Sequence, residues 1–453
     1  MENNNTAIGI LGAGISGLAT AYYLQKEGYS STVYEQSESI GGAIKTNQTD
    51  NWLVDEGPNT LMVKSPQMWA LLNELNLSSK VAEANNCAKR RYIVKDRQPV
   101  PLPHSFTDFL TTTLISGKAK LHLLKEPFIN ASEATDESIA TFIRRRLGRE
   151  PLDYGFNPAV SGIYAGDPKK LSIKHTFPRL WRMEQQQGSL LKGLIRKDTP
   201  ANKSKRSLIS FTGGNQLLPK ALANQLNNPV QTSTTVKEAR YKNGQWNTTV
   251  ENGHQPVQTH HKLIISTLPA YELAGIFGPD FSTLSTIDYA PISIAALGYR
   301  DEQIQHPLDG FGMLVPAAEN MNLLGALFSS TLFCKRAPRD HQLCTCFIGG
   351  TRSPELAAIH LSELKKIAHS ELKSLLHITG QPVYSHLKCW PQGIPQYRVG
   401  YDRILENITK LENEYNGLLL EGNFKNGISV SDCILSAAET AQKATRYMKN
   451  IGL

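Results

Sequence analysis

Three glycines near the N-terminus have the types and spacing needed to bind a phosphate. Gly12, Gly14 and Gly17 follow a short apolar run and precede an amphipathic segment. In such a pattern the first glycine permits a tight turn, the second leaves room for a pyrophosphate, and the third lets a helix pack closely on a strand. Free amides at the start of that helix would hold the phosphates. Residues 7–35 are therefore predicted to form a strand–helix–strand unit that binds a dinucleotide.

The residues after this unit indicate which dinucleotide it binds. Glu35 lies about 20 residues beyond the turn, where a carboxylate can accept hydrogen bonds from ribose hydroxyls and repel the 2′-phosphate of NADP. A second glycine pair, Gly41 and Gly42, offers another close approach of backbone, which suits the longer isoalloxazine arm of FAD. No second glycine fingerprint follows in the later strands. We therefore predict one FAD, reduced by an organic substrate and reoxidised by oxygen or another external acceptor.

Other reactive groups are sparse. The chain has no GxSxG or HExxH motif and no carboxylate pair typical of hydrolases. Its six cysteines are scattered, as expected of reduced thiols, and Cys344 and Cys346 lack partners with zinc spacing. We interpret these two cysteines as core residues and predict no metal site.

The charge and the hydropathy of the chain limit the kinds of partner that it is expected to bind. The net charge of +8 favours an anionic partner, but Lys and Arg are dispersed and not interleaved with aromatic residues, so nucleic acid is not expected. Anionic lipid or an anionic small molecule remains. No apolar run reaches 18 residues, and residues 1–5 are polar and lead directly into the first strand. We expect a cytoplasmic protein, with peripheral contact to a membrane as an open alternative.

The elements that must position these residues alternate along the chain. Ser65 and Pro66 have the pattern of a helix start, 217–226 that of a helix, and 263–267 and 418–420 those of buried strands. Asn-Gly turns at 243–244 and 252–253 indicate antiparallel strands from Thr235 onward. Ser431 or Asp432 is expected to cap a last helix to Met448, whose N-terminus can stabilise a reduced flavin. Together these elements predict an interrupted nucleotide domain.

Between 90 and 206 the pattern becomes mainly helical. A strand-like basic piece at 90–94 comes first, and a helix begins near Asp136 with Arg144, Arg145 and Arg146 on its solvated side. Residues 161–168 are too rich in glycine for simple helix, and 199–205 has the composition of an exposed link. From 288 to 401, β-like runs and an amphipathic helix over 355–376 predict a substrate domain.

An amphipathic basic run, 106–125, allows two interpretations. Its apolar residues, Phe106, Phe109, Leu110, Leu114 and Ile115, can pack on the protein's own core or lie on a membrane surface, with lysines behind them.

Several internal motifs carry a resemblance to a known family. They are 142–147, VSGIYAGDPKKLS at 160–172, FTGGNQLLP at 211–219, FGMLVP at 311–316, FIGGTR at 347–352 and WPQGIPQYRVG at 390–400. Together with the fingerprint they resemble the oxygen-dependent, FAD-containing protoporphyrinogen oxidases and the related coproporphyrinogen oxidases. The fingerprint alone is shared with amine oxidases and phytoene desaturases of one superfamily.

The resemblance implies a mixed α/β and α+β fold in which a discontinuous Rossmann-type FAD-binding domain carries a β-sheet substrate domain and an inserted helical domain. The expected parts of the FAD-binding domain are 1–85, 206–280 and 403–453. The helical insertion is expected over 86–205 and the substrate domain over 281–402.

The activity implied is aromatisation of a porphyrinogen by removal of six electrons in three rounds through noncovalent FAD, with oxygen reduced to peroxide, in heme biosynthesis. Hydride loss from a meso carbon makes a pyrrole N–H acidic, so positioning the ring is a larger task than supplying a base. Protoporphyrinogen IX is the preferred substrate, because Arg91, the spacing of the loop around Gly162 and an acid-poor clamp resemble that branch more. Coproporphyrinogen III stays the alternative, because both substrates carry propionates. A homodimer is also compatible with the resemblance.

By motif position, the family's substrate site falls on a small set of residues. Arg91 matches the basic residue that pairs with a propionate, although Arg90 or Lys89 could do so instead. The rest of the implied set is an apolar clamp of Leu314, Leu327 and Phe347, two backbone positions near the macrocycle at Gly162 and Gly312, and Asn59 near the flavin. The implied cofactor-binding residues are Gly12, Gly14, Ile15, Ser16, Gly17, Glu35, Gly41, Gly42, Ala43, Lys45, Gly57, Pro58, Val236, Trp390, Gly422, Ile428, Ser429 and Val430.

Three rival interpretations stay open. One is a flavin amine oxidase and another a carotenoid desaturase of the same superfamily. The third is a non-catalytic carrier of flavin or tetrapyrrole, because a shared architecture does not fix a function. The clamp and its glycines can also be read as ordinary core residues.

Overall fold

Four parallel strands form the centre of the dinucleotide-binding part in the computed structural model, which describes residues 6–195, 207–253 and 255–453. They lie in the order β19-β13-β1-β2. The sheet thus joins the beginning, the middle and the end of the chain, which confirms the interrupted domain. The bounds are β1 Ile8–Leu11, β2 Ser31–Tyr34, β13 Leu263–Ser266 and β19 Leu418–Leu420.

Both faces of this sheet are covered, and this is why β1 and β13 are continuous apolar runs without alternation. Ile8 and Ile10 belong to the core cluster on one side, whereas Leu11 belongs to the cluster on the other. Helices α1 (Ile15–Lys26), α11 (Leu217–Asn224) and α16 (Val430–Asn450) pack on the first side. The other side carries β10 Thr235–Lys242, β11 Gln245–Glu251, β12 Val257–His261, α12 Leu273–Phe277 and α15 Asp402–Glu414.

Local signals are confirmed in this part of the chain. Asn243 and Gly244 both have positive φ, at 54° and 73°, which closes the tight turn between β10 and β11. Helix α2 (Pro66–Glu74) begins after Ser65, whose side chain accepts a hydrogen bond from the amide of Met68. The smaller sheets are β3 Thr46–Thr49 with β4 Trp52–Asp55, and β5 Leu61–Val63 and β6 Val81–Glu83 on either side of β9 Ser207–Phe211.

A seven-stranded sheet forms the second part, in the order β18-β14-β17-β16-β15-β7-β8. Strand β7 pairs in parallel with β15, so residues 90–101 extend this sheet and the helices begin only after β8. Helix α14 covers one face and begins at Leu361, not at 355, because 354–357 forms a 3-10 turn and His360 caps the helix. The bounds are β7 Arg90–Lys95, β8 Gln98–Pro101, β14 Tyr289–Arg300, β15 Gly310–Leu314, β16 Leu323–Phe328, α13 Ser329–Leu332, β17 His341–Gly349, α14 Leu361–Leu376 and β18 Tyr384–Pro395.

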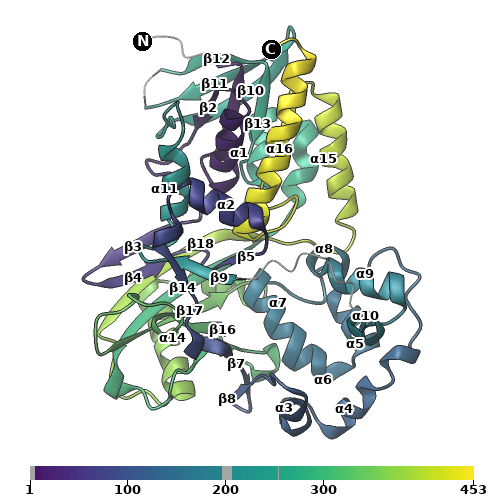
Figure 1. Cartoon of the computed structure of the whole chain (residues 1–453), viewed down its shortest axis with the longest axis vertical. Coiled ribbons are helices and arrows are strands. Elements are labelled where there is room, and N and C mark those ends of the chain that lie inside the picture. The colour runs from purple at the N-terminus through teal and green to yellow at the C-terminus, as the bar shows by residue number, and fades with distance from the viewer. Residues whose placement is uncertain (1–5, 196–206, 254) are drawn as a thin grey trace.

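The third part is helical and lies beside the sheet, below the dinucleotide-binding part (Figure 1). The predicted loop at 161–168 is partly wrong, because α7 continues to Tyr164 and ends where Ala165 adopts a left-handed conformation. The predicted link at 199–205 lies outside the described residues. The bounds are α3 Phe106–Thr111, α4 Gly117–Leu123, α5 Ile139–Arg146, α6 Arg149–Pro151, α7 Asn157–Tyr164, α8 Ile173–Thr176, α9 Pro178–Gln187 and α10 Leu190–Ile195.

The prediction of a solvated arginine run is wrong for Arg146, which is 0% exposed. Its guanidinium donates to Glu184 and, at 3.1 Å, to Oε1 of Glu126. It also donates to three backbone carbonyls, so most of its donors are satisfied. Burial of a charge is tolerated under these conditions. Arg144 is exposed, and Arg145 is half-buried and pairs with two carboxylates.

Candidate functional site

The glycine turn has the shape that a pyrophosphate needs. Gly12 has a φ of 98°, and a Cβ on Gly17 would lie 2.0 Å from the carbonyl oxygen of Gly12, so no larger residue fits there. A Cβ on Gly14 would meet no atom within 4 Å, so open space lies beside the backbone at that position. Ile15 and Ser16 begin α1, whose N-terminal amides face this space. These residues therefore fit the pyrophosphate of FAD.

The second glycine pair is brought against this turn. The amide of Gly41 donates to the carbonyl oxygen of Ala13 at 2.8 Å, and a Cβ on Gly42 would lie 3.3 Å from the Cα of Gly14. Ala43 follows directly, and the Nζ atom of Lys45 donates to Ser39 at 3.1 Å. Two close backbone approaches thus adjoin, as the sequence indicated for a flavin dinucleotide.

Glu35 is fixed by two backbone amides. Its Oε2 accepts from Ala13 and its Oε1 from Ser37, both at 2.9 Å. A carboxylate has about four acceptor sites, so acceptor capacity remains for ribose hydroxyls. We call the glycine turn, Glu35 and the Gly41-Gly42 pair, with the segments that adjoin them, the cradle. The carbonyl of Glu35 accepts from the amide of Thr234 at 2.8 Å, which places Val236 near this end of the cradle.

A loop after β4 connects the cradle to the seven-stranded sheet. A Cβ on Gly57 would lie 2.0 Å from the carbonyl oxygen of Ala43, so the two backbones touch. Asn59 donates from Nδ2 to the carbonyl of Gly57 at 2.9 Å, and Asn215 donates to the carbonyl of Pro58 at 2.7 Å. The indole of Trp390 donates to the carbonyl of Glu56 at 2.6 Å. The loop therefore holds its shape through neighbours on three segments.

The last helix completes the cradle. Gly422 has a φ of 147° and turns the chain after β19. Ser429, and not Ser431 or Asp432, caps α16, because its hydroxyl accepts from the amide of Asp432 at 3.1 Å. Val430 is the first residue of α16, and Ile428 packs at the junction of two core clusters.

Glu421 is a buried acid beside this turn. Its Oε2 accepts hydrogen bonds from Ser436 and Thr440, each at 2.8 Å, while its Oε1 has no partner. Burial raises the pKa of this carboxyl. A raised pKa favours the neutral form of this carboxyl.

Strand register places the predicted clamp on one face of the seven-stranded sheet. Leu314 lies opposite Gly325, and Gly325 lies opposite Phe347, so the three form a row across β15, β16 and β17. Leu327 is two residues from Gly325 and therefore shares that face. The three clamp side chains are half-buried, whereas Met313, Ala326 and Cys346 on the opposite face are buried under α14. The sheet thus has one closed face and one open face.

Two glycines shape the open face. Gly312 has a φ of 148°, and a Cβ there would lie 2.2 Å from the carbonyl oxygen of Ala326. A Cβ on Gly162 of α7 would lie 2.6 Å from Cδ2 of Leu314, so the helix contacts the clamp directly. Helix α7 therefore lies close over the sheet, and the absence of a side chain at Gly162 sets the distance between them.

The structure distinguishes between neighbouring basic residues. Arg90 forms an ion pair with Asp309, whose other oxygen accepts from Tyr92. Arg91 is exposed, lies opposite Gly312 in the strand register, and has its guanidinium 5.4 Å from the centre of the Phe311 ring. In the described part of the chain no carboxylate pairs with Arg91. Of the two arginines, Arg91 is therefore the one free to bind a carboxylate from outside, while Lys89, the other candidate, is also exposed and forms no ion pair with a described residue.

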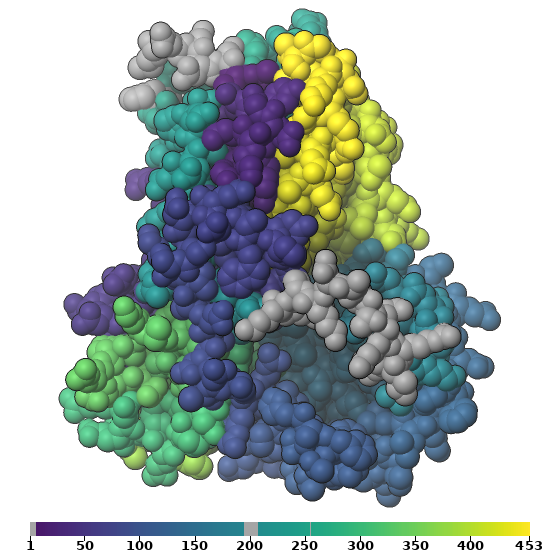
Figure 2. Space-filling view, viewed as in Figure 1, coloured from purple at the N-terminus to yellow at the C-terminus, as the bar shows by residue number. Residues whose placement is uncertain are grey.

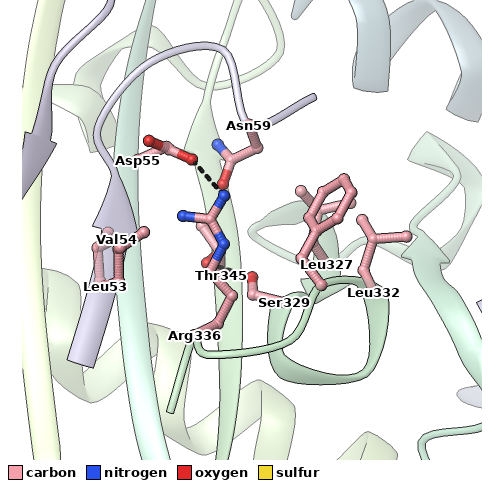
Figure 3. A pocket seen from close by; sticks show the side chains of 10 residues that line it. Leu53, Val54, Asp55, Asn59, Leu327, Ser329, Leu332, Arg336 and Thr345 are labelled. Carbon is pink, nitrogen blue, oxygen red and sulfur yellow. Dashed lines mark hydrogen bonds and ion pairs between the residues drawn. The ribbon is translucent and has the colours of Figure 1, made fainter. Parts of the chain in front are cut away.

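A small hollow lies where the loop of Asn59 meets Leu327 (Figure 3). Its floor is the ion pair of Asp55 and Arg336, at 2.9 Å, with both side chains almost fully buried. Asp55 also accepts from Thr46 and from the amide of Asn215. The hollow has room for about one water molecule, so it cannot hold a macrocycle. The ion pair of Asp55 and Arg336 therefore holds the loop after β4 to the seven-stranded sheet.

Two residues near the site were not singled out from the sequence. Lys388 lies opposite Ile294, which in turn lies opposite Phe347, and its Nζ is 4.9 Å from the centre of the Trp390 ring. Arg352 contacts both α7 and β15. The motifs at 347–352 and 390–400 pointed to this region of the chain. The strand register places Lys388 near the site, and hydrogen bonds place Arg352 there.

Comparison with known proteins identifies the class. Residues 15–445 match the family described as flavin containing amine oxidoreductase, and the chain belongs to that family. It is an FAD-dependent oxidoreductase with an α/β cofactor domain and a sheet domain.

Within that class, two kinds of relative stand out. Protoporphyrinogen oxidase 2 of Arabidopsis thaliana is 34% identical, with 98% of this chain and 94% of the relative covered. Coproporphyrinogen III oxidase of Bacillus subtilis is 26% identical, with 99% of this chain and 100% of the relative covered. An Exiguobacterium crystal structure, described provisionally as a protoporphyrinogen oxidase, has a TM-score of 0.83 at 22% identity and covers 97% of this chain and 98% of its own.

Proposed function

We propose that this protein oxidises protoporphyrinogen IX to protoporphyrin IX in heme biosynthesis, with oxygen as acceptor and peroxide as product. The observation that carries the proposal is the open face of the seven-stranded sheet. It presents apolar side chains for a macrocycle and ends at Arg91, a guanidinium without a carboxylate partner among the described residues. The identity to Arabidopsis protoporphyrinogen oxidase 2 supports it.

The glycine turn and Glu35 would hold FAD, which would supply a two-electron acceptor that oxygen can reoxidise, used once in each of three rounds. The chain's own contribution is to position the ring. Leu314, Leu327 and Phe347 exclude water from one side of the macrocycle, and Gly162 allows α7 to lie close to it. Arg91 binds a propionate through its two-pronged guanidinium. The pyrrole N–H becomes acidic once hydride has left, so water can take its proton.

A direct experiment tests this reaction. The purified FAD-bound protein is mixed anaerobically with protoporphyrinogen IX, and flavin absorbance and porphyrin fluorescence are followed together. We expect the flavin to bleach while porphyrin appears. If neither protoporphyrinogen IX nor coproporphyrinogen III bleaches the flavin, the proposal is wrong. Peroxide release with amines or desaturation of a polyene would indicate the other branches of the family, and ligand binding without reduction would indicate a carrier.

Coproporphyrinogen III oxidation is the second candidate, supported by the full-length similarity to the Bacillus subtilis enzyme. Both substrates carry propionates, so Arg91 serves either. Initial rates with the two substrates, compared as kcat/KM, decide between them.

A membrane surface is the proposed location of the helical part. Phe106 and Leu110 are 74% and 54% exposed, Phe109 and Ile115 are half-buried and Leu114 is buried, so packing of this run on the protein's own core holds only in part. Leu124 in the run and Phe128 just after it are 67% and 86% exposed. The run forms two helices, α3 and α4, at the lower edge of the molecule (Figure 2). No described helix is long and apolar enough to cross a bilayer. We place the protein in the cytoplasm, in peripheral contact with the membrane.

Self-association stays a prediction. A homodimer is expected from the family resemblance, and light scattering of the FAD-bound protein measures it.

A further inference from the structure

Arg352 joins the helix over the site to the sheet below it. Its Nη2 donates to Oγ of Ser161 on α7 and to the carbonyl of Val315 after β15, each at 3.1 Å. Its Nη1 makes a longer contact, 3.5 Å, with the carbonyl of Leu323 at the start of β16. One planar group therefore contacts α7 and both ends of the connection between β15 and β16.

These contacts adjoin the residues that face each other across the site. Ser161 precedes Gly162, and Val315 follows Leu314. The gap between Gly162 and Leu314 is so narrow that a Cβ on the glycine would lie 2.6 Å from the leucine Cδ2. Any change in the spacing of α7 and β15 therefore changes the space available at the clamp.

The backbone before Arg352 holds the same helix a second time. The amide of Thr351 donates to the carbonyl of Ala165 at 2.7 Å, at the end of α7. A Cβ on Gly350 would lie 2.6 Å from that carbonyl oxygen. The segment Gly349–Arg352 thus fixes both the last turn of α7 and the ends of β15 and β16.

The acceptors of Arg352 are all neutral. In the described part of the chain no carboxylate forms an ion pair with it, and burial lowers the pKa of its guanidinium. A partly buried cation without a carboxylate is costly and is kept where its fork geometry is needed. A lysine carries the same charge, but its ammonium ends one bond short of the position of Nη2, which donates to both Ser161 and Val315, and it has no second nitrogen to contact Leu323.

We propose that Arg352 is a positioning residue that sets the spacing between Gly162 on α7 and Leu314 on β15, and with it the position of the clamp side chain against which a planar tetrapyrrole packs. This assignment rests on the proposed function for its substrate, but the tie between helix and sheet stands apart from it.

The test uses the full FAD-bound chain with Arg352→Lys. We expect KM for protoporphyrinogen IX to rise about tenfold with kcat within about twofold, because binding is lost and the reacting groups are not. The flavin content stays that of the wild type. Amide hydrogen exchange in residues 160–164 becomes faster, because α7 loses its tie to the sheet.

Two further variants sharpen the result. Arg179→Lys makes the same change at an exposed position of α9 and leaves KM and the exchange of α7 unchanged. Ser161→Ala removes one acceptor only and raises KM about threefold, which keeps the proposal testable if Arg352→Lys does not fold.

Three results overturn the proposal. The first is an unchanged KM in Arg352→Lys, and the second is unchanged exchange in α7. The third is loss of flavin and thermal stability while the remaining folded enzyme keeps the wild-type KM, which defines a role in stability alone. If the wild-type protein oxidises neither porphyrinogen, the proposed function fails, and the exchange of α7 still decides whether Arg352 ties the helix to the sheet.

Discussion

The Oε2 atom of Glu35 accepts a hydrogen bond from the amide of Ala13 at 2.9 Å, so the acid is fastened to the glycine turn that precedes it by 22 residues. Its other oxygen accepts from Ser37. The carboxylate therefore shapes the cradle before any ribose reaches it, and its two roles, holding the turn and binding the sugar, depend on the same negative charge.

Replacing Glu35 with Gln is expected to weaken FAD binding. The amide nitrogen of Gln cannot accept a hydrogen bond, so the amide of either Ala13 or Ser37 loses its partner, at a cost of about 1–3 kcal/mol. We expect the FAD dissociation constant of the apoprotein to rise about 10- to 100-fold, measured by flavin fluorescence quenching. Glu38→Gln, an exposed change three residues away, is the control. Equal affinities for the two variants would contradict the assignment.

Replacing Arg91 with Ala is expected to raise KM for the porphyrinogen about 10- to 100-fold, because a hydrogen bond to a charged group contributes about 1.5–3 kcal/mol. Flavin content should not change. The matched control is Arg90→Ala, since the Arg90 guanidinium is already paired with Asp309. Steady-state kinetics measure both. A larger effect at Arg90 than at Arg91 would show that the other cation binds the propionate.

Arg146→Met is expected to destabilise the helical part by about 3 kcal/mol, because it leaves the buried carboxylates of Glu126 and Glu184 without this partner. Arg145 still pairs with Glu184, which limits the loss. Urea unfolding, followed by helix content, measures the change. Arg144→Met at the neighbouring exposed position should be nearly neutral, and similar losses for both variants would refute the buried network.

Glu421→Gln is expected to change how stability depends on pH. Burial raises the pKa of Glu421 in the folded state, so the folded state holds its proton more tightly than the unfolded state. The contribution of this group to stability is full below its ordinary pKa of 4.5 and is lost as the pH rises through the raised folded value. Glutamine does not titrate, so the variant should gain stability relative to the wild type between pH 5 and pH 8 in urea unfolding.

The control for this change lies on α16, the helix whose Ser436 and Thr440 donate to Glu421. Glu439 is exposed, and Glu439→Gln should show the pH dependence of the wild type. A difference between Glu421→Gln and the wild type that does not grow with pH would show that Glu421 is ionised in the folded protein.

Replacing Leu124 and Phe128 with Ser is expected to weaken co-flotation with anionic liposomes about tenfold, because both side chains are exposed and apolar. The matched control replaces Val257 and Val383, two exposed apolar residues elsewhere, and should float like the wild type. If the wild-type protein does not float with the liposomes at low salt, the proposed peripheral contact with a membrane is wrong.

The sequence was most informative where the signal is local. The spacing of Gly12, Gly14 and Gly17 is a backbone requirement, and the structure shows the close approach of Gly17 to Gly12 that forbids a side chain. Ser65 before Pro66 and Asn243 before Gly244 likewise act within one turn, so a helix start and a hairpin were predicted correctly. The choice of Ser431 or Asp432 as cap was wrong by two residues, because several polar residues near a helix start can accept the same amide.

Contacts between residues far apart in the chain could not be predicted from local sequence patterns. Arg146 looked solvated because its carboxylate partners, Glu126 and Glu184, lie 20 and 38 residues away. The run at 106–125 looked suited to a core, but no apolar surface of the described chain covers Phe106 or Leu110. In both places burial depends on what the rest of the chain brings near, and periodicity does not report that.

By itself the sequence determined the glycine turn and the acid of the cofactor site, since the glycine spacing and Glu35 act through the backbone of one continuous segment. Only the tertiary structure decided how the substrate side is built. Strand register puts Leu314 and Phe347 on one face, pairing with Asp309 removes Arg90 from consideration, and Arg352 holds α7 over the sheet. These relations join residues between 33 and 219 positions apart, and they exist only once the chain has closed its sheets.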